Sequence, residues 1–313
     1  YNESCAAIAL FFFALRMREL DRNAVYGDVA ERVLYNGLLS STSLDGKSFF
    51  YENPLEINLS SYDRETAVAK GERERLPITT RLEAFDCSCC PPNVNRFFAR
   101  FSGFLALEED GRLTVEQYVS ARIASSFGQV NVREEYAVSG KVTLSSENYS
   151  AETLAFRLPL WSKSLTVVLN GKEIIPKKEN GYAVLAVPSA FVLELDFHIA
   201  PVLVSASARV RENAGKVALT YGPLVYCLEG IDNGEHLWEL SLPVSSLDKA
   251  VKTQNPLYRL PDFTLQGCRL SSAFSLYFPA GEETEAPCPL VFRPYFTFAN
   301  RGKTDMSVWV RKK

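Results

Sequence analysis

The sequence lacks the marks of several functional classes. It has 34 lysines and arginines against 37 aspartates and glutamates, and the net charge of −3 gives no basic surface for nucleic acid or an acidic membrane. Seven cysteines in 313 residues are too few, and an odd number, for the disulfide scaffold of a secreted protein. Internal repeats and low-complexity tracts are also absent. We therefore expect a globular protein with reduced thiols that does not bind nucleic acid.

Long hydrophobic runs are scarce as well. Residues 6–15, AAIALFFFAL, are apolar, but a run of about ten residues is half of the roughly 20 needed to cross a bilayer. The run has no basic region ahead of it and no small-residue cleavage site behind it, as a signal peptide would. We interpret it as a buried helix and expect no membrane partner. The length of 313 residues predicts two or three domains, and the 47% hydrophobic content is ordinary for a globular protein.

The first hundred or so residues predict helices. Residues 1–20 are apolar nearly all the way round, which predicts a helix that must be covered on most of its surface. Further helices are predicted at about residues 24–39 and 93–107, with an extended segment at 47–54 and a polar loop at 60–80 that contains the charge run KGERER. Three helices cannot close a core around an all-apolar helix. We therefore expect the native protein to continue upstream of this chain.

From about residue 108 the pattern changes to alternating apolar and polar residues. This period of two, interrupted by turn signals such as Asn170-Gly171 and Asn180-Gly181, is typical of short antiparallel strands packed as sandwiches. A second block of strands begins near residue 211. The three tryptophans, Trp161, Trp238 and Trp309, are interpreted as sandwich core rather than sugar-stacking platforms. His198 and His236, in or beside predicted strands, are interpreted as core or surface residues.

The densest chemical motif is FDCSCCPPN, residues 85–93. Thiolates are ligands that zinc prefers, and Cys87, Cys89 and Cys90 offer up to three within four positions. The prolines fix the chain direction and let Asn93 cap the next helix, where thiolate charge is favoured. Buried small residues without a metal are the alternative, and the spacing by itself does not choose between the two.

A single metal would need a further ligand from elsewhere in the chain. Glu3 and Cys5, two residues apart at the start of the first predicted helix, are the candidates that the sequence offers. An adjacent pair such as Cys89-Cys90 strains the geometry of a mutual disulfide but can bind one metal if the backbone bends.

Several segments resemble glycoside hydrolase family 127, the β-L-arabinofuranosidase family. They are ESCAAIALFFFALRM, AERVLYNGLLSSTSLDGKSFFYENPLE, CSCCPPNVNRFFARFSGFLA, LPLWSKSLTVVLNGK, VALTYGPLVYCLEGIDN and PYFTFANRG. The resemblance runs in collinear order over essentially the whole chain. It implies the C-terminal part of an (α/α)₆ barrel followed by two antiparallel β-sandwich domains. On this basis we expect domains at residues 1–106, 107–210 and 211–313.

The same resemblance implies a Zn²⁺ ion held by Glu3, Cys5, Cys89 and Cys90. It also implies that Cys89 is the nucleophile of a retaining mechanism, that Tyr51 lines the sugar pocket, and that the substrate is an arabinofuranosyl glycan or glycopeptide. Cys87 lies beside the site without being a ligand. Glu31 lies on a helix near a segment that faces the pocket in the family, and an exposed or capping carboxylate is its alternative interpretation.

One part of the family pattern falls outside these residues. A retaining glycosidase needs an acid/base group, which in the family is a glutamate upstream of the E-x-C motif, and only two residues precede Glu3. We therefore expect negligible turnover from this polypeptide alone, with the upstream barrel segment as its missing partner. Reduced thiolates favour the cytoplasm, and the periplasm is the alternative. The sequence leaves homodimer formation open.

Two other functions fit the same residues. A non-catalytic carbohydrate-binding or scaffold module would use the zinc only for structure. A redox or zinc-storage site would lose its metal readily and form disulfides among Cys87, Cys89 and Cys90.

Overall fold

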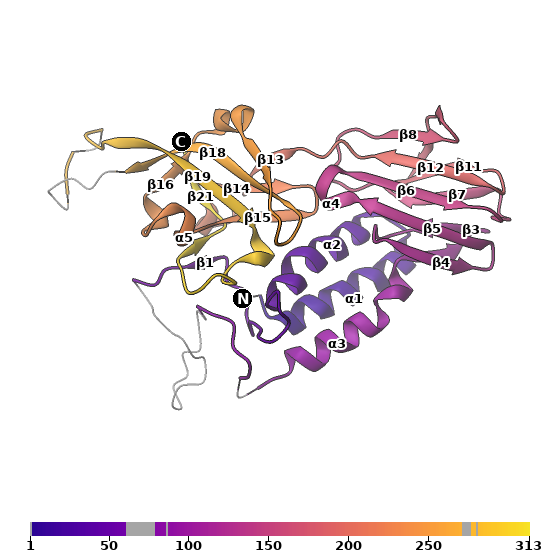
Figure 1. Cartoon of the computed structure of the whole chain (residues 1–313), viewed down its shortest axis with the longest axis horizontal. Helices are drawn as coiled ribbons and strands as arrows, with labels where there is room; N and C mark the ends of the chain where they lie inside the picture. The colour runs from indigo at the N-terminus through magenta and orange to yellow at the C-terminus, as the bar shows by residue number, and fades with distance from the viewer. Residues whose placement is uncertain (1, 61–78, 86, 271–276, 280) are drawn as a thin grey trace. The chain divides into compact units, whose positions relative to one another are not determined.

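The computed structural model describes residues 2–60, 79–85, 87–270, 277–279 and 281–313 (Figure 1). The chain forms two compact units. One contains residues Cys5–Tyr35 and Cys89–Ala200; we call it the thiol unit. The other contains residues 1–4, Asn36–Ser88 and Pro201–Lys313; we call it the C-terminal unit. The predicted loop at 60–80, with its KGERER run, lies almost entirely outside the described residues.

Three helices occupy the first part of the thiol unit. They are α1 (Ser4–Asp21), α2 (Val25–Val33) and α3 (Cys90–Phe101). Helix α1 ends where Arg22 adopts a left-handed backbone conformation, with its N–H donating to the Arg18 carbonyl. Phe11 of α1 packs edge-to-face on Phe97 of α3, with ring centroids 4.8 Å apart. The apolar helix predicted at residues 1–20 is thus confirmed, although Phe13 and Leu20 on it are exposed.

The helix predicted at 24–39 forms over nearly that range, but only its first part is an α-helix. The helix expected at 24–39 ends as an α-helix at Val33 and continues as a π-turn, Leu34–Leu38, and a 3₁₀ turn, Leu39–Ser41. The Ser40 and Ser41 hydroxyls donate to the carbonyls of Asn36 and Leu38, which competes with regular helical bonding.

The helix expected at 93–107 begins earlier, because prolines are tolerated in the first turn, where no amide donor is needed. Asn93 therefore lies inside α3 and does not cap it. Its side chain instead accepts a hydrogen bond from Arg96 Nε at 3.1 Å. The N-cap position belongs to Cys89.

The rest of the thiol unit is a two-sheet β structure. One sheet has the order β10-β11-β7-β3-β2 and the other β4-β5-β6-β12-β8-β9. The strands of the first sheet are β2 (Ala106–Glu109), β3 (Arg112–Val115), β7 (Thr153–Arg157), β10 (Lys177–Glu179) and β11 (Tyr182–Ala186). Those of the second are β4 (Ala121–Ser125), β5 (Gly128–Glu135), β6 (Lys141–Ser146), β8 (Thr166–Leu169), β9 (Lys172–Glu173) and β12 (Phe191–Asp196). A short helix, α4 (Tyr136–Ser139), joins β5 to β6. All pairs are antiparallel except β3 with β7, which is parallel.

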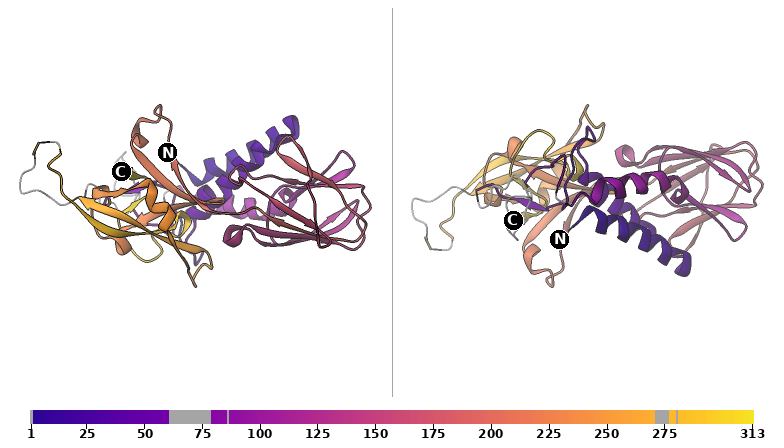
Figure 2. Two further views of the ribbon diagram at one scale, coloured as in Figure 1. Left: turned by 90° about the horizontal axis from the view of Figure 1, so that it is seen from above. Right: turned by 90° about the horizontal axis from the view of Figure 1, so that it is seen from below.

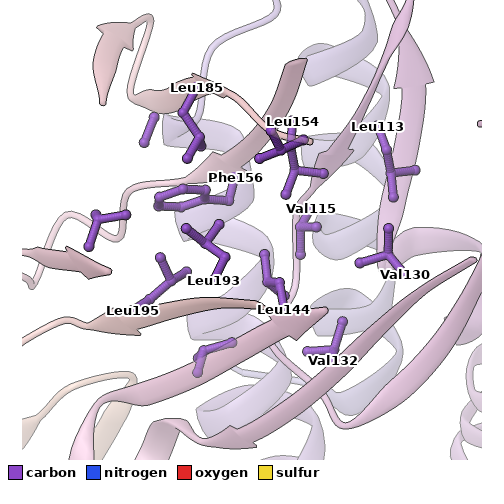
Figure 3. Packing of buried hydrophobic residues seen from close by; sticks show 14 of the residues in the cluster. Leu113, Val115, Val130, Val132, Leu144, Leu154, Phe156, Leu185, Leu193 and Leu195 are labelled. Carbon is purple, nitrogen blue, oxygen red and sulfur yellow. The ribbon is translucent and has the colours of Figure 1, made fainter. Parts of the chain in front are cut away.

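The alternating pattern of the sequence becomes the core between these two sheets. Figure 3 shows apolar side chains of both sheets pointing toward one another, for example Phe156 and Leu185 opposite Leu193 and Leu144. The side chains of Phe156, Leu193 and Leu144 are completely buried. Both predicted hairpins form: Asn170-Gly171 joins β8 to β9 and Asn180-Gly181 joins β10 to β11, all four residues with positive φ.

The C-terminal unit contains one ten-stranded sheet. Its order is β1-β20-β15-β19-β18-β16-β21-β14-β13, with β17 paired to β18. The strands are β1 (Glu56–Ile57), β13 (Pro201–Ser205), β14 (Lys216–Tyr221), β15 (Leu224–Glu229), β16 (Leu240–Leu242), β17 (Val251–Gln254), β18 (Pro261–Leu270), β19 (Glu285–Pro294), β20 (Met306–Ser307) and β21 (Val310–Lys312). Because β15 pairs with β14 as well as with β19, hydrogen bonding closes the sheet into a circuit.

The chain is thus helical first and β-rich afterwards, as the sequence predicts (Figures 1 and 2). Among the described residues, no helix combines the length and the apolar character needed to cross a membrane. The division into three domains at 106 and 210 stays a prediction.

Candidate metal centre

Three thiols converge at the N-terminal ends of two helices in the thiol unit. Cys5 lies in the first turn of α1, Cys90 is the first residue of α3, and Cys89 directly precedes α3. The aromatic contact between Phe11 and Phe97 lies six residues after Cys5 and seven after Cys90, so α1 and α3 run in parallel. Their packing therefore brings both helix starts to the same place.

The sulfur positions fit a tetrahedral metal ion. The Sγ atoms of Cys5 and Cys89 are 3.6 Å apart and those of Cys89 and Cys90 are 3.9 Å apart. All three lie within 4.8 Å of one another. Metal–sulfur bonds of about 2.3 Å at tetrahedral angles would place two sulfurs about 3.8 Å apart. The observed distances are too long for a disulfide bond, and all three cysteines are free.

The surroundings of the thiols also favour a cation. Burial and the neighbouring Cys5 and Cys89 raise the pKa of the Cys90 thiol well above its usual value. Three thiolates this close would repel one another, so the deprotonated cluster needs a positive charge among the sulfurs. The start of α3, a helix of 12 residues, contributes a small part of it through the helix dipole, although Pro91 and Pro92 in its first turn carry no N–H.

The three thiols differ in their access to solvent. Cys90 has 1% of its surface exposed, whereas Cys5 and Cys89 are half-buried. Cys87, which the motif places nearby, is exposed and lies outside the group of three. A ligand arriving from solvent can therefore reach Cys5 and Cys89 more readily than Cys90.

Two predicted site residues belong to the C-terminal unit. Glu3 forms a single β-bridge with Glu52, and Tyr51 packs its ring against Phe85 with centroids 6.0 Å apart. The backbone carbonyl of Tyr51 accepts a hydrogen bond from the N–H of Ser4. The roles of Glu3 as a metal ligand and of Tyr51 in the sugar pocket stay predictions.

Glu31 is not the exposed or capping carboxylate considered for it, and a place near the sugar pocket stays a prediction. It is buried, and its carboxylate accepts hydrogen bonds from the Tyr136 hydroxyl at 2.7 Å and from Trp161 Nε1 at 3.1 Å, besides an ion pair with Arg157. The guanidinium of Arg157, itself fully buried, also donates to Asp28 at 2.6 Å. Glu31 therefore joins α2 to the β structure of the thiol unit.

Arg18 forms a second buried ion pair of this kind. Its guanidinium lies 2.8 Å from the Glu116 carboxylate, pairs with Glu109, and donates to the Tyr182 hydroxyl at 3.0 Å. Sequence reasoning missed both arginines. A charged residue at an inward-facing position of an apolar segment, such as Arg157 in LAFRLP, would have predicted a buried ion pair.

Comparison with known families first identifies the class of the protein. Three domain families of glycoside hydrolases match the chain in succession. They are the family 127 β-L-arabinofuranosidase catalytic domain at residues 1–103, the family 127 β-L-arabinofuranosidase middle domain at 112–191, and the family 127 C-terminal domain at 201–311.

The chain belongs to glycoside hydrolase family 127. It is 34% identical to a non-reducing end β-L-arabinofuranosidase of Bifidobacterium longum, a match that covers all of this chain and 49% of that protein. A crystal structure of a family 127 β-L-arabinofuranosidase from Geobacillus stearothermophilus is 33% identical with a TM-score of 0.88, over 100% of this chain and 50% of that one. A second solved family 127 β-arabinofuranosidase is 29% identical, has a TM-score of 0.83, and shows the same coverage. The chain thus spans about half the length of these relatives.

Proposed function

We propose that the chain is the metal- and nucleophile-bearing part of a zinc-dependent, retaining β-L-arabinofuranosidase. The observation that carries the proposal is the convergence of Cys5, Cys89 and Cys90 within 4.8 Å in a member of family 127. The names of two relatives, both β-L-arabinofuranosidases, support a glycan or glycopeptide ending in L-arabinofuranose as substrate. Helices α1 to α3 would then be part of an (α/α)₆ barrel.

The donor set decides which metal is expected and what it does. Three thiolates suit zinc, with the Glu3 carboxylate as the proposed fourth ligand. Zinc bound there would keep the cysteines ionised at neutral pH, despite the raised pKa of Cys90. Cys90, which is sealed from solvent, would act as a ligand only. Cys5 and Cys89 are both half-buried, so the choice of Cys89 as nucleophile and of Cys5 as a ligand follows the family pattern rather than solvent access.

The reaction would proceed in two displacements. The Cys89 sulfur attacks the anomeric carbon of the arabinofuranose, forming a carbon–sulfur bond while the bond to the leaving oxygen breaks and that oxygen takes a proton from a general acid. Water then attacks the same carbon, loses a proton to the same group, and releases Cys89 as a thiolate. Two inversions give net retention. Tyr51 is the proposed wall of the sugar pocket.

A furanosyl electrophile and a metal assay together test this proposal. We expect about one zinc per chain by elemental analysis, in keeping with a four-coordinate site. We also expect a bromoacetamido arabinofuranoside to alkylate Cys89, as located by peptide mass spectrometry. Cys87→Ala is the matched control, because Cys87 is an exposed neighbouring thiol and its loss should leave labelling intact. Cys89→Ala should abolish labelling.

The alternatives give other results. Zinc with labelling of exposed Cys87 only would indicate a non-catalytic carbohydrate-binding module with a structural metal. Ready loss of zinc with disulfides among the thiols would indicate a redox or storage site. The 313-residue polypeptide by itself is expected to have negligible turnover, because it spans about half of its relatives. Robust release of arabinose by it would contradict that expectation.

A further inference from the structure

The C-terminal unit contains a small cavity that is separate from the thiols. Its volume is about 140 Å³, and it lies where strands β1 and β20 pair, beside the 3₁₀ turn Leu237–Glu239 and the strands β14 and β21. Its lining includes Trp238, Trp309, Glu56, Lys216, Asp305 and Arg311.

Trp238 is unusual in this setting because 45% of its surface is exposed. The prediction that it belongs to the core was wrong, whereas Trp161 does pack against the core of the thiol unit. The indole of Trp238 lies against the imidazole of His236, with ring centroids 4.7 Å apart and planes inclined by 31°. A large aromatic surface held in water at a cavity is typical of a binding site rather than of packing.

The turn that carries Trp238 is held in place by Asp305. One carboxylate oxygen of Asp305 accepts a hydrogen bond from the N–H of Leu59 at 2.8 Å, and the other accepts one from the N–H of His236 at 3.3 Å. His236 adopts a left-handed conformation with φ of 58°, which non-glycine residues rarely do. The anchored turn fixes the indole before any ligand arrives, which lowers the entropic cost of binding.

The charges around the cavity cancel. Glu56 and Asp305 oppose Lys216 and Arg311, so the lining favours neither an anion nor a cation. Within the part of the chain that the structure describes, no hydrogen bond or ion pair involves the side chains of Glu56 and Lys216. A carboxylate acceptor and an ammonium donor therefore remain for hydroxyl groups of a neutral ligand.

Size and chemistry together define the ligand class. The cavity is well below the roughly 300–1,000 Å³ typical of drug-sized ligands, so it accommodates about one ring. A sugar ring presents C–H groups to an aromatic face and hydroxyls around its edge. The broader concave surface lined by Arg122, Asn131 and Thr143 in the thiol unit has no aromatic ring among its lining residues and offers no stacking platform.

We propose that this Trp238 cavity binds a single neutral sugar residue, as an auxiliary carbohydrate site. No cysteine lines this cavity. The proposed sugar binding can therefore be tested independently of the proposed catalysis. Its function would be to keep the C-terminal unit on a glycan.

Indole NMR signals test the proposal directly in the full chain. L-Arabinose and methyl β-D-galactopyranoside are the probes, titrated to about 100 mM because a single ring binds weakly. The Nε1–H signals of Trp238 and Trp309 should shift with saturation, and that of Trp161 should not. Each signal is assigned by a single Trp→Phe substitution. D-Glucuronate and D-glucosamine, which carry opposite charges, should each bind more weakly than the neutral sugars.

Variants give a second, independent readout. Trp238→Ala should weaken binding at least about tenfold, as expected for loss of an aromatic anchor, while Trp238→Phe should retain part of it. Leu257→Ala is the matched control, since Leu257 is an exposed apolar residue of the same unit. If the circular dichroism spectrum shows that Trp238→Ala disturbs the fold, Lys216→Met is used instead. It removes the ammonium donor proposed to bind a sugar hydroxyl and should also weaken binding.

Three outcomes would overturn the proposal. The first is the absence of saturable indole shifts. The second is unchanged sugar affinity in both single variants, Trp238→Ala and Lys216→Met. The third is tighter binding of D-glucuronate or D-glucosamine than of the neutral sugars. Cys89→Ala should leave the indole shifts as they are. If Cys89 of the unsubstituted chain is not labelled but the indole shifts are observed, the result counts against the catalytic proposal alone.

Discussion

Glu31 has 2% of its surface exposed and shares a buried site with Arg157, Tyr136 and Trp161. Its carboxylate is the partner that lets a fully buried guanidinium stay charged. Burial by itself would lower the pKa of Arg157, but Glu31 and the other acidic groups around it raise that pKa instead. At the scale of one residue, charge balance in the interior therefore explains Glu31 better than catalysis does.

Glu31→Gln should destabilise the protein strongly. The substitution keeps the shape of the side chain but removes one of the two ion pairs that Arg157 forms among the described residues, leaving the pair with Asp28. Loss of one partner from a buried ion pair costs about 3–5 kcal/mol in the free energy of unfolding. Urea denaturation followed by circular dichroism measures this change. Glu147→Gln, at an exposed glutamate, is the control and should change little; equal effects of the two substitutions would contradict the assigned role.

At the scale of elements, two hairpins with the same Asn-Gly turn differ in what they touch. The β10–β11 turn packs on the start of α2, where the N–H of Ala24 donates to the Asn180 carbonyl at 2.9 Å. A Cβ atom on Gly181 would lie 2.6 Å from that of Ala24, whereas one on Gly171 in the β8–β9 turn would meet nothing within 4 Å. Both glycines have positive φ, 82° and 78°.

Gly181→Ala should therefore cost more stability than Gly171→Ala. Both substitutions strain a left-handed turn, by about 1 kcal/mol each. Only the first also forces a steric contact with α2, which should add about 1–3 kcal/mol. Thermal unfolding of the two variants side by side measures the difference. Equal losses would mean that the turn does not pack on α2 in solution.

Local patterns predicted the elements better than the contacts between them. The hairpins, the early helices and the later strands followed from turn residues and periodicity. The boundaries of α3 did not, because Pro91 and Pro92 fit a first helical turn as well as a loop. All three thiols of the cluster were named from the sequence: CSCC supplied Cys89 and Cys90, and the ESC segment with the family resemblance supplied Cys5. Spacing alone could not show that Cys5 meets the other two, because the packing of α1 on α3 brings them together. Arg18 and Arg157 were missed because their carboxylate partners lie from 91 to 129 residues away in the sequence.

At the scale of the whole molecule, the two units should respond differently to acid. In the C-terminal unit, burial would raise the pKa of Asp232, but hydrogen bonds from Arg301 and Arg293 outweigh it and lower the pKa to about 2. In the thiol unit, burial raises the pKa of Asp28 and of Glu116 above the usual values. A lowered carboxyl pKa stabilises the folded state when ionised, whereas a raised one makes ionisation costly.

Acidification should therefore weaken the C-terminal unit through Asp232. The stabilisation is complete above a pH of about 4 and is lost as the pH falls toward 2, by about 2 kcal/mol. Hydrogen exchange, corrected for the intrinsic effect of pH and resolved by peptide, should show the loss in residues 216–313. Asp232→Asn should be less stable at neutral pH and should lack this step. A step of the same size in the variant would contradict the assignment.

The parallel start of α1 and α3 has a practical consequence. In a denatured chain only sulfurs close together in the sequence, such as those of Cys89 and Cys90, readily share an ion, because Cys5 is 84 positions from Cys89. Packing of α1 on α3 adds the Cys5 sulfur as the third donor. The fraction of chains that retain zinc tightly therefore measures the fraction that is natively folded. A chelator competition would then report folding quality without any sugar being present.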